Sequence, residues 1–233
     1  MLDKSHELRD NNTRNSWLFC ISHTRNGGIG MTDNLVITIS RQYGTGGREI
    51  GHKLALRLGI SFFDRELITR AAKKSGFSEE LFEQLDKRAT NSFLYSLTMF
   101  GSTGLNGMSL TDQLYLAQAK VIREAAESGP CVIVGRCADH VLRECTNKFD
   151  FFIHGTLEDR IRRIQTCGDY EITGKSPEAA LEKMDKQRST YYNYYTGKAW
   201  GKCDHYDLCV NSGRLGVDKS VELIMTYIDA LKK

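Results

Sequence analysis

Glycine, arginine and glutamate residues stand a few positions after an apolar run that ends at Ile39. They stand in the order Gly44, Thr45, Gly46, Gly47, Arg48, Glu49. The apolar run predicts a buried strand, and the residues after Gly47 have the apolar spacing of a helix. A glycine-rich turn between a strand and a helix can wrap a phosphate group, because glycine allows close backbone approach and the first helical N–H groups are free. The segment Gly44–Gly47, called the glycine turn below, is therefore predicted to bind phosphate; the alternative is a tight turn without a ligand.

The glycine turn departs from the standard phosphate-binding loop, G-x-x-x-x-G-K-[ST]. Gly47 stands at the position of the lysine, and Glu49 stands in the first helical turn, where a hydroxyl is expected. Arg48 is placed to supply the missing positive charge, although its planar fork differs in geometry from a lysine. Glu49 suits a phosphate site if it faces away or holds a cation through water. We therefore expect Arg48 to act in place of the loop lysine.

Charged residues also follow two other predicted strands. Asp64 and Arg65 come after the second strand, and Arg136 comes after the third. The carboxyl ends of parallel strands form the edge where open α/β sheets bind ligands. Arginine suits bidentate recognition of phosphate or carboxylate, so we expect these residues to bind a ligand there. The alternatives are a helix cap for Asp64 and an ion pair between Arg136 and a carboxylate such as Asp139.

Basic residues gather on two predicted helices, which are joined by the polar segment Cys167–Lys175. They are Arg160, Arg162, Arg163, Lys183, Lys186 and Arg188. Two basic helices joined by a mobile loop can close over a transferring phosphoryl group and exclude water. We expect a helical lid over about residues 160–190, with Arg160 and Arg188 as the preferred pair. The alternative is that these charges only face solvent.

Strand and helix patterns alternate after residue 34, which predicts an α/β fold with three layers and a parallel sheet of about five strands flanked by helices. The predicted strands are Leu35–Ile39, Ile60–Phe63, Cys131–Val134, Phe149–Ile153 and Asp207–Asn211. The predicted helices are Arg48–Leu58, Glu66–Ser75, Ser78–Lys87, Asn91–Phe100, Thr111–Ser128, Leu157–Thr166, Pro177–Tyr195 and Val217–Leu231. Gly101–Ser109 is expected to be a mobile loop.

Composition excludes several classes of protein. The net charge of +3 is too small to indicate nucleic-acid binding, and no apolar run reaches the length of about 18 residues that a membrane helix needs. Seven cysteines without a C-x-x-C pair favour reduced thiols in a cytoplasmic protein. The spacing of Cys203, His205 and Cys209 matches no common zinc site. We expect a weakly ordered extension over residues 1–33, for which Met31 offers an alternative start codon, and one domain over residues 34–233.

The tyrosine-rich segment Tyr191–Tyr195 has two interpretations. Its rings can stack on a nucleotide base, or they can pack the lid helix onto the body of the protein or onto a second subunit. We favour packing. The sequence leaves homo-oligomerisation open.

Together these residues resemble the cytidylate kinase-like family, a branch of the P-loop nucleoside monophosphate kinases. The similar blocks, within residues 34–233, are Ile39–Gly51, Phe63–Ile68, Val132–Arg136, Thr156–Ile164, Asp185–Gly197 and Asp207–Gly216. The resemblance implies that Gly44 to Glu49 bind the ATP phosphates. It implies that Asp64 and Arg65 bind a nucleoside monophosphate and that Arg136 binds its phosphate. It also implies that the transferring phosphoryl group is stabilised by Arg188 and by arginines of the helix before it, namely Arg160, Arg162 or Arg163.

The chain also departs from that family. Gly47 replaces the loop lysine, Glu49 replaces the magnesium-binding hydroxyl, and Val134 replaces an acidic residue before Gly135. We expect a kinase that transfers a phosphoryl group from ATP to a nucleoside monophosphate, with CMP or dCMP as the first candidates. Mg²⁺ would be held through Glu49, Asp64 or bridging waters, without a dedicated protein metal site. The alternatives are a nucleotide-binding regulatory protein with little catalysis and a kinase of another small molecule.

Overall fold

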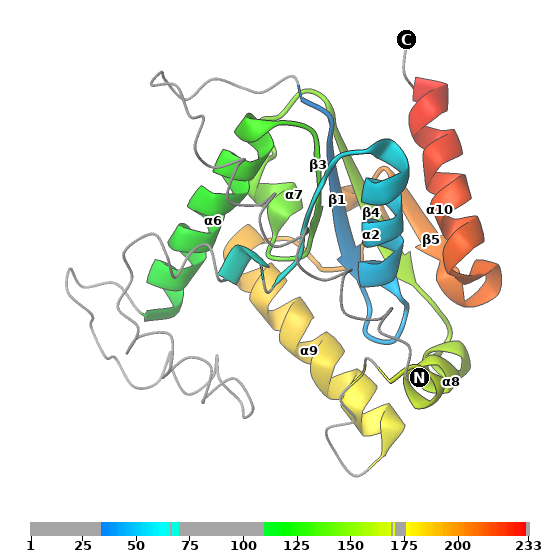
Figure 1. The fold of residues 1–233 in the computed structure, drawn as a ribbon. Coiled ribbons are helices and arrows are strands. Elements are labelled where there is room, and N and C mark those ends of the chain that lie inside the picture. The colour runs from blue at the N-terminus through cyan, green and yellow to red at the C-terminus, as the bar shows by residue number, and fades with distance from the viewer. Residues whose placement is uncertain (1–33, 66, 70–109, 169, 171–175, 232–233) are drawn as a thin grey trace, which may run out of the picture.

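The computed structural model describes residues 34–65, 67–69, 110–168, 170 and 176–231 (Figure 1). The predicted extension 1–33 lies outside this part of the chain. So do the predicted helices Ser78–Lys87 and Asn91–Phe100, most of Glu66–Ser75, the loop Gly101–Ser109 and most of Cys167–Lys175.

A parallel sheet of five strands forms the centre of the molecule and confirms the predicted fold class (Figure 1). The strands are β1 (Val36–Arg41), β2 (Ser61–Phe63), β3 (Cys131–Val134), β4 (Lys148–His154) and β5 (Leu208–Asn211). They lie in the order β2-β3-β1-β4-β5, and every pair is parallel. All their carboxyl ends therefore meet at one edge, which we call the carboxyl edge.

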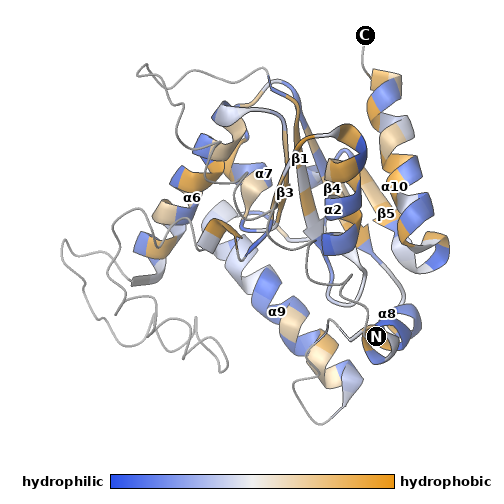
Figure 2. Cartoon of the chain, in the orientation of Figure 1, coloured by the Kyte–Doolittle hydropathy of each residue, from blue (hydrophilic) through white to orange (hydrophobic). Residues whose placement is uncertain are grey.

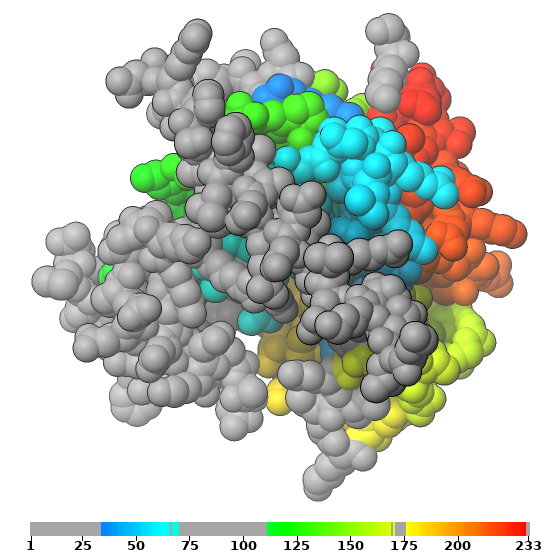
Figure 3. Space-filling view, in the orientation of Figure 1, coloured from blue at the N-terminus to red at the C-terminus, as the bar shows by residue number. Residues whose placement is uncertain are grey.

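Helices cover both faces of the sheet, as the three-layer prediction requires (Figure 2). Helices α2 (Gly47–Leu58) and α10 (Ser212–Leu231) cover one face and lie against each other (Figure 3). Helices α6 (Leu110–Ser128) and α7 (Ala138–Val141) cover the other. Successive residues of a strand point to opposite faces, so both faces must be apolar, which explains the continuous apolar strand sequences.

Two more helices lie at the carboxyl edge and span the predicted lid (Figure 1). They are α8 (Leu157–Thr166) and α9 (Pro177–Thr196). Both helices are capped, because the hydroxyls of Thr156 and Ser176 each accept a hydrogen bond from a backbone N–H of the first turn. A small apolar cluster, in which Tyr43, Ile164 and Leu181 are buried, packs these helices against the residues just before the glycine turn.

The structure differs from the predicted elements at particular ends. Strand β1 continues to Arg41, two residues beyond the predicted end, because the backbone stays paired with β4 although its side chains become polar. Helix α10 begins at Ser212, but the backbone is non-helical at Gly216 (φ 74°), so the regular part matches the predicted Val217–Leu231. Helix α7 and the 3₁₀ helix η2 (Cys203–His205) were not predicted, because such short elements show no apolar period.

Among the described residues, no helix combines the length and the apolar character needed to cross a lipid bilayer.

Helix α2 packs closely on the sheet at Gly51. A Cβ atom at this position would lie 2.8 Å from Val134 Cγ2 and 3.1 Å from Ile39 Cδ1. Both side chains belong to buried strands and have no room to move. Gly51 therefore sets the distance at which α2, and with it the glycine turn, lies over the carboxyl edge.

We predict that Gly51→Ala destabilises the protein by about 1–2 kcal/mol, because overpacking outweighs the gain of up to about 1 kcal/mol in helix propensity. Urea unfolding measures this difference. Leu56→Ala is the control on the same helix, because Leu56 is 68% exposed, and it should change the unfolding free energy little. A variant at Gly51 that is more stable than the parent would contradict the close packing.

Candidate functional site

The glycine turn has the backbone shape of a phosphate-binding loop. Gly44 (φ 79°) and Gly46 (φ 72°) adopt the left-handed conformation, and helix α2 begins at Gly47. A Cβ atom at Gly46 would also lie 2.8 Å from Cζ of Arg163. The turn sits at the carboxyl end of β1, with the first turn of α2 directly after it. Helix N–H groups at such a position face the carboxyl edge, where they could bind an anion.

Two backbone N–H groups of this region donate to side chains of the predicted lid. The N–H of Gly46 donates to the hydroxyl of Tyr170 at 3.1 Å. The N–H of Tyr43 donates to the Asp185 carboxylate at 2.6 Å, and Asp185 also pairs with Arg160 at 2.5 Å. The side-chain oxygens therefore accept hydrogen bonds from N–H groups that could otherwise donate to phosphate oxygens.

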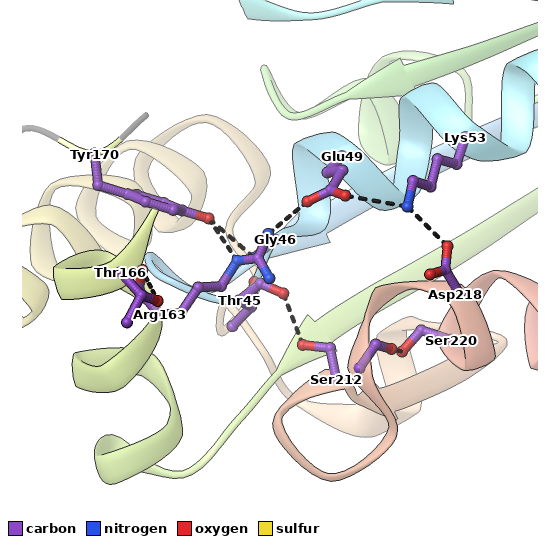
Figure 4. Close-up of polar contacts among 11 residues, drawn as sticks. Thr45, Gly46, Glu49, Lys53, Arg163, Thr166, Tyr170, Ser212, Asp218 and Ser220 are labelled. Carbon is purple, nitrogen blue, oxygen red and sulfur yellow. Dashed lines mark hydrogen bonds and ion pairs between the residues drawn. The ribbon is translucent and has the colours of Figure 1, made fainter. Parts of the chain in front are cut away.

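Glu49 is held between two cations beside the glycine turn (Figure 4). Its carboxylate pairs with Nη2 of Arg163 at 2.5 Å and with Nζ of Lys53 at 3.2 Å. Lys53 pairs in turn with Asp218 of α10 at 2.7 Å. Burial lowers the pKa of Arg163, but its hydrogen bonds to Tyr170 and Glu49 outweigh this and leave the pKa above the ordinary value. Arg163 thus lies over the turn as a fixed cation.

Arg48 pairs with Asp64 across the carboxyl edge. Nε of Arg48 lies 2.7 Å from Oδ2 of Asp64, which is only 4% exposed. The other oxygen of Asp64 accepts the N–H of Leu67 at 3.0 Å. Asp64 therefore acts as a cap for the residues after β2, which was the alternative to ligand binding in the sequence analysis. It also holds the Arg48 side chain toward the end of β2. Arg65 follows Asp64 directly in the chain and is exposed.

Arg136 follows β3 in a strained backbone. Gly135, Arg136 and Cys137 all have positive φ (84°, 58° and 55°), which is costly for the two residues that are not glycine. The guanidinium lies over the ring of Tyr191, 5.4 Å from its centroid, and its buried Nε has no hydrogen-bond partner among the described residues. The ion pair with Asp139 does not form, because the carboxylate of Asp139 accepts the Tyr192 hydroxyl at 2.6 Å instead.

Arg188 and Arg160 contact the strand and loop that lead to the glycine turn. Nη1 of Arg188 donates to the carbonyl of Arg41 at 3.0 Å, and its guanidinium lies over the Tyr43 ring, 5.2 Å from the centroid. Nη1 of Arg160 donates to the carbonyl of Tyr43 at 3.3 Å. Burial lowers the pKa of Arg188. The structure therefore brings both predicted lid arginines to the turn, whereas exposed Arg162 pairs with Asp159 of its own helix.

Arg41 is a charged residue of this site that the sequence analysis missed. It ends β1, and burial together with the charges of Arg188, Arg136 and Arg65 holds its pKa well below the ordinary value. It stands between polar Ser40 and Gln42, beyond the predicted strand end at Ile39, and nothing in this local pattern separates an inward arginine from an exposed one. Its place at the end of a predicted buried strand, just before the glycine turn, was the available signal.

The tyrosines of α9 pack on the body of the protein, as favoured. Tyr195 stacks on Tyr115 of α6 with ring centroids 4.0 Å apart. The Tyr191 hydroxyl donates to Gln118 at 3.3 Å, and burial raises the pKa of Tyr191 to about 12. These contacts hold α9, and therefore Arg188, against the carboxyl edge.

The described cysteines are free thiols, and burial raises the pKa of Cys131 to about 12, which makes it inert. In the part of the chain that the structure describes, no group of three His, Cys, Asp or Glu side chains could hold a metal ion. Glu49 and Asp64, the carboxylates expected to help hold Mg²⁺, are paired with basic side chains.

The sequence matches a known protein family over most of its length. A model of the cytidylate kinase-like family matches residues 36–214, which is more than half of the chain. The chain belongs to the cytidylate kinase-like family. Membership of this kinase-like family supports phosphoryl transfer and nucleotide binding as the general chemistry. No curated protein is significantly similar to this family member in sequence.

Solved structures similar to this cytidylate kinase-like chain share its fold. An uncharacterized protein from Eubacterium ventriosum is 26% identical, with a TM-score of 0.62, and the match covers 84% of this chain and 98% of that one. A shikimate kinase from Bacteroides thetaiotaomicron is 15% identical, with a TM-score of 0.51 and coverage of 84% and 98%. A gluconokinase from Sinorhizobium meliloti is 13% identical, with a TM-score of 0.50 and coverage of 85% and 96%. The two kinases support the fold only.

Tyr192→Phe tests how the site is anchored. The variant leaves buried Asp139 without its 2.6 Å hydrogen bond, which should cost about 1–3 kcal/mol of stability at pH 8. Burial already raises the pKa of Asp139, and the Tyr192 hydroxyl lowers it in part, so the variant raises it further. The folded state then binds the proton more tightly than the unfolded state, and stability falls as pH rises between the two pKa values.

The measurement is urea unfolding of the variant and the parent between pH 5 and pH 8. The difference between them should shrink toward pH 5, where Asp139 is closer to neutral. Tyr227→Phe is the matched control, because Tyr227 packs by its ring against Phe149 and Phe151. A stability loss that is the same at both pH values would rule out Asp139 as its cause.

Proposed function

We propose that this protein is an ATP-dependent kinase that transfers the γ-phosphoryl group to the phosphate of a nucleoside monophosphate, with CMP and dCMP as the first candidates. The observation that carries this proposal is the meeting of the glycine turn, Arg136 and the arginines of α8 and α9 at one carboxyl edge. Donor and acceptor phosphates both need cations at such an edge. Membership of the cytidylate kinase-like family supports the same chemistry.

Each group then has a role. ATP lies with its phosphates at the glycine turn, within reach of Arg48 and Glu49. The acceptor lies over β2 and β3, where Arg65 and Arg136 bind its phosphate and Asp64 orients Arg48. An oxygen of the acceptor phosphate attacks the γ-phosphorus, the bond to the bridging oxygen breaks, and ADP leaves with the electron pair.

The arginines of the lid stabilise the charge on the transferring group and exclude water. Arg163 already lies over Gly46, and Arg160 and Arg188 already contact the chain before the turn. These cations are preorganised, so little reorganisation is needed when charge moves toward the bridging oxygen.

Mg²⁺ would reach this site with the nucleotide. In proteins it is usually bound by one or two carboxylates together with substrate phosphates and water. Glu49 and Asp64 fit that part, because Glu49 lies in the first turn of α2 and Asp64 contacts Arg48 of the same turn, and each would exchange a basic partner for the ion or its waters. Bound there, the ion would neutralise charge on the phosphates.

A second candidate function is nucleotide binding with little catalysis. The observation that favours it is the set of bonds that closes the turn: Gly46 to Tyr170, Tyr43 to Asp185, and Glu49 to Arg163. A nucleotide must displace the first two before its phosphates can use the same N–H groups.

We expect ADP release when the protein is mixed with MgATP and CMP or dCMP, measured with a coupled assay over a panel of nucleoside monophosphates. Nucleotide binding is measured separately by the melting shift that bound ligand produces. Binding without turnover would favour the second candidate. If ADP is released only with another acceptor, that acceptor and not CMP is the substrate. If no nucleotide binds at all, both proposed functions are wrong.

We predict that Tyr170→Phe binds ADP about 2–10 times more tightly than the parent, because one competing hydrogen bond of about 0.5–1.5 kcal/mol is lost. The ring keeps its edge contact with Tyr43, whose centroid is 5.3 Å away. Isothermal titration calorimetry measures the dissociation constants, with Tyr227→Phe as the remote control. Weaker binding would mean that the Tyr170 hydroxyl contacts the nucleotide itself.

A further inference from the structure

The standard loop pattern points to an exchange of residues around the glycine turn. In G-x-x-x-x-G-K-[ST], the first glycine stands six positions before the lysine. With the second glycine at Gly46 and the lysine position at Gly47, the first glycine falls at position 41, where this chain has arginine. The glycine and the basic residue have therefore changed places.

In the structure, the two exchanged positions, Arg41 and Gly47, lie in contact with each other. A Cβ atom at Gly47 would lie 2.7 Å from Cβ and 2.8 Å from Cγ of Arg41. Apart from Arg41, the nearest atom to that Cβ is Cβ of Ile153, at an ordinary 3.6 Å. Gly47 lacks a side chain because Arg41 passes over it, and no positive φ requires glycine there.

The guanidinium of Arg41 ends between the turn and the acceptor side of the carboxyl edge. A Cβ atom at Gly135, just after β3, would fall on Nη1 of Arg41. Arg136 follows Gly135, and its buried Nε has no partner in the described structure. Arg188 is bonded to the carbonyl of Arg41. One basic group thus lies between donor and acceptor sides, with further arginines beside it.

This cluster lacks sufficient negative charge. Within the described ranges, the guanidinium of Arg41 makes no hydrogen bond and no ion pair, and the charges of Arg188, Arg136 and Arg65 each act on it more strongly than the opposite charge of Asp64. Partly buried like charges repel each other unless an anion compensates them. Arginine forks bind phosphate oxygens in a bidentate way.

We propose that Arg41 binds a phosphate group of the substrates at the carboxyl edge, in place of the lysine that the loop lacks, and that Arg136 and Arg188 complete this site. The ligand class is a di- or polyphosphate, or two phosphate groups brought together. This inference rests on the proposed function for its place in a reaction, and it names Arg41, rather than Arg48, as the cation that replaces the loop lysine.

The test uses sodium pyrophosphate as the probe at constant ionic strength, with affinity from calorimetry and melting temperature from calorimetric scans. Arg41→Gln should lose about tenfold to a hundredfold in pyrophosphate affinity. Its melting temperature without ligand should rise by about 2–4 °C, because a repelled charge is removed. Exposed Arg123 of α6 gives the control Arg123→Gln, which should leave the affinity unchanged.

A second set of variants tests the exchange itself. Gly47→Ala should lower the melting temperature of the parent, because of the contact with Arg41, but not of the Arg41→Gly variant. The double variant Arg41→Gly/Gly47→Lys, which has the standard loop order, should bind pyrophosphate more tightly than Arg41→Gly.

Three results would overturn the proposal: no pyrophosphate binding by the parent, unchanged affinity in Arg41→Gln, or a loss confined to Arg48→Gln. Restored binding in the double variant would support it, and a lack of any restoration would count against the exchange. Pyrophosphate binding that depends on Arg41, without ADP release for any acceptor, would leave this site standing and contradict only the proposed kinase activity.

Discussion

Repulsion among arginines at one edge of the sheet is the constraint that the site must accommodate. Arg41, Arg136 and Arg188 come from β1, the end of β3 and α9, so no single element could hold them together. The free energy that keeps them close comes from the apolar layers on both faces of the sheet, where the residues of β3 and all but the last of β1 are buried. A less stable core would let these charges move apart. Here they stay close together, and a bound anion would reduce their repulsion.

The carboxylates of the site form hydrogen bonds and ion pairs with groups other than Arg41. Asp185 accepts the N–H of Tyr43 and pairs with Arg160, Glu49 pairs with Lys53 and Arg163, and Asp64 pairs with Arg48. These bonds tie α8 and α9 to the glycine turn, and within the described residues none of these carboxylates forms an ion pair with Arg41. The same contacts that hold the turn in shape therefore compete with a phosphate for it. If a nucleotide binds as we propose, its phosphates would have to replace the Tyr170 hydroxyl at the N–H of Gly46, and Arg163, which is also bonded to that hydroxyl, would respond.

Local pattern predicted most of the fold. The strands were recognisable because burial on both faces makes them continuously apolar. The predicted helix starts at Leu157 and Pro177 were right, and the hydroxyls of Thr156 and Ser176 cap them there. The elements that were missed, α7 and η2, are too short to show a period. The site was predicted in part: the turn, Arg136 and the arginines of the lid were named, because charged residues after buried strands must meet at the carboxyl edge.

The sequence by itself determined the α/β architecture, the family, and the absence of a lysine at Gly47, since each depends on the order of residues along the chain. Only the tertiary structure decided which cation stands where that lysine would be. Arg41 and Gly47 are six positions apart, and their relationship is a contact between a strand end and a helix start that no periodic pattern contains. The pairing of Arg48 with Asp64, and of Glu49 with Arg163, likewise depends on how separate elements meet. Contacts between elements select the partner of each charge, whereas the sequence lists only the charges.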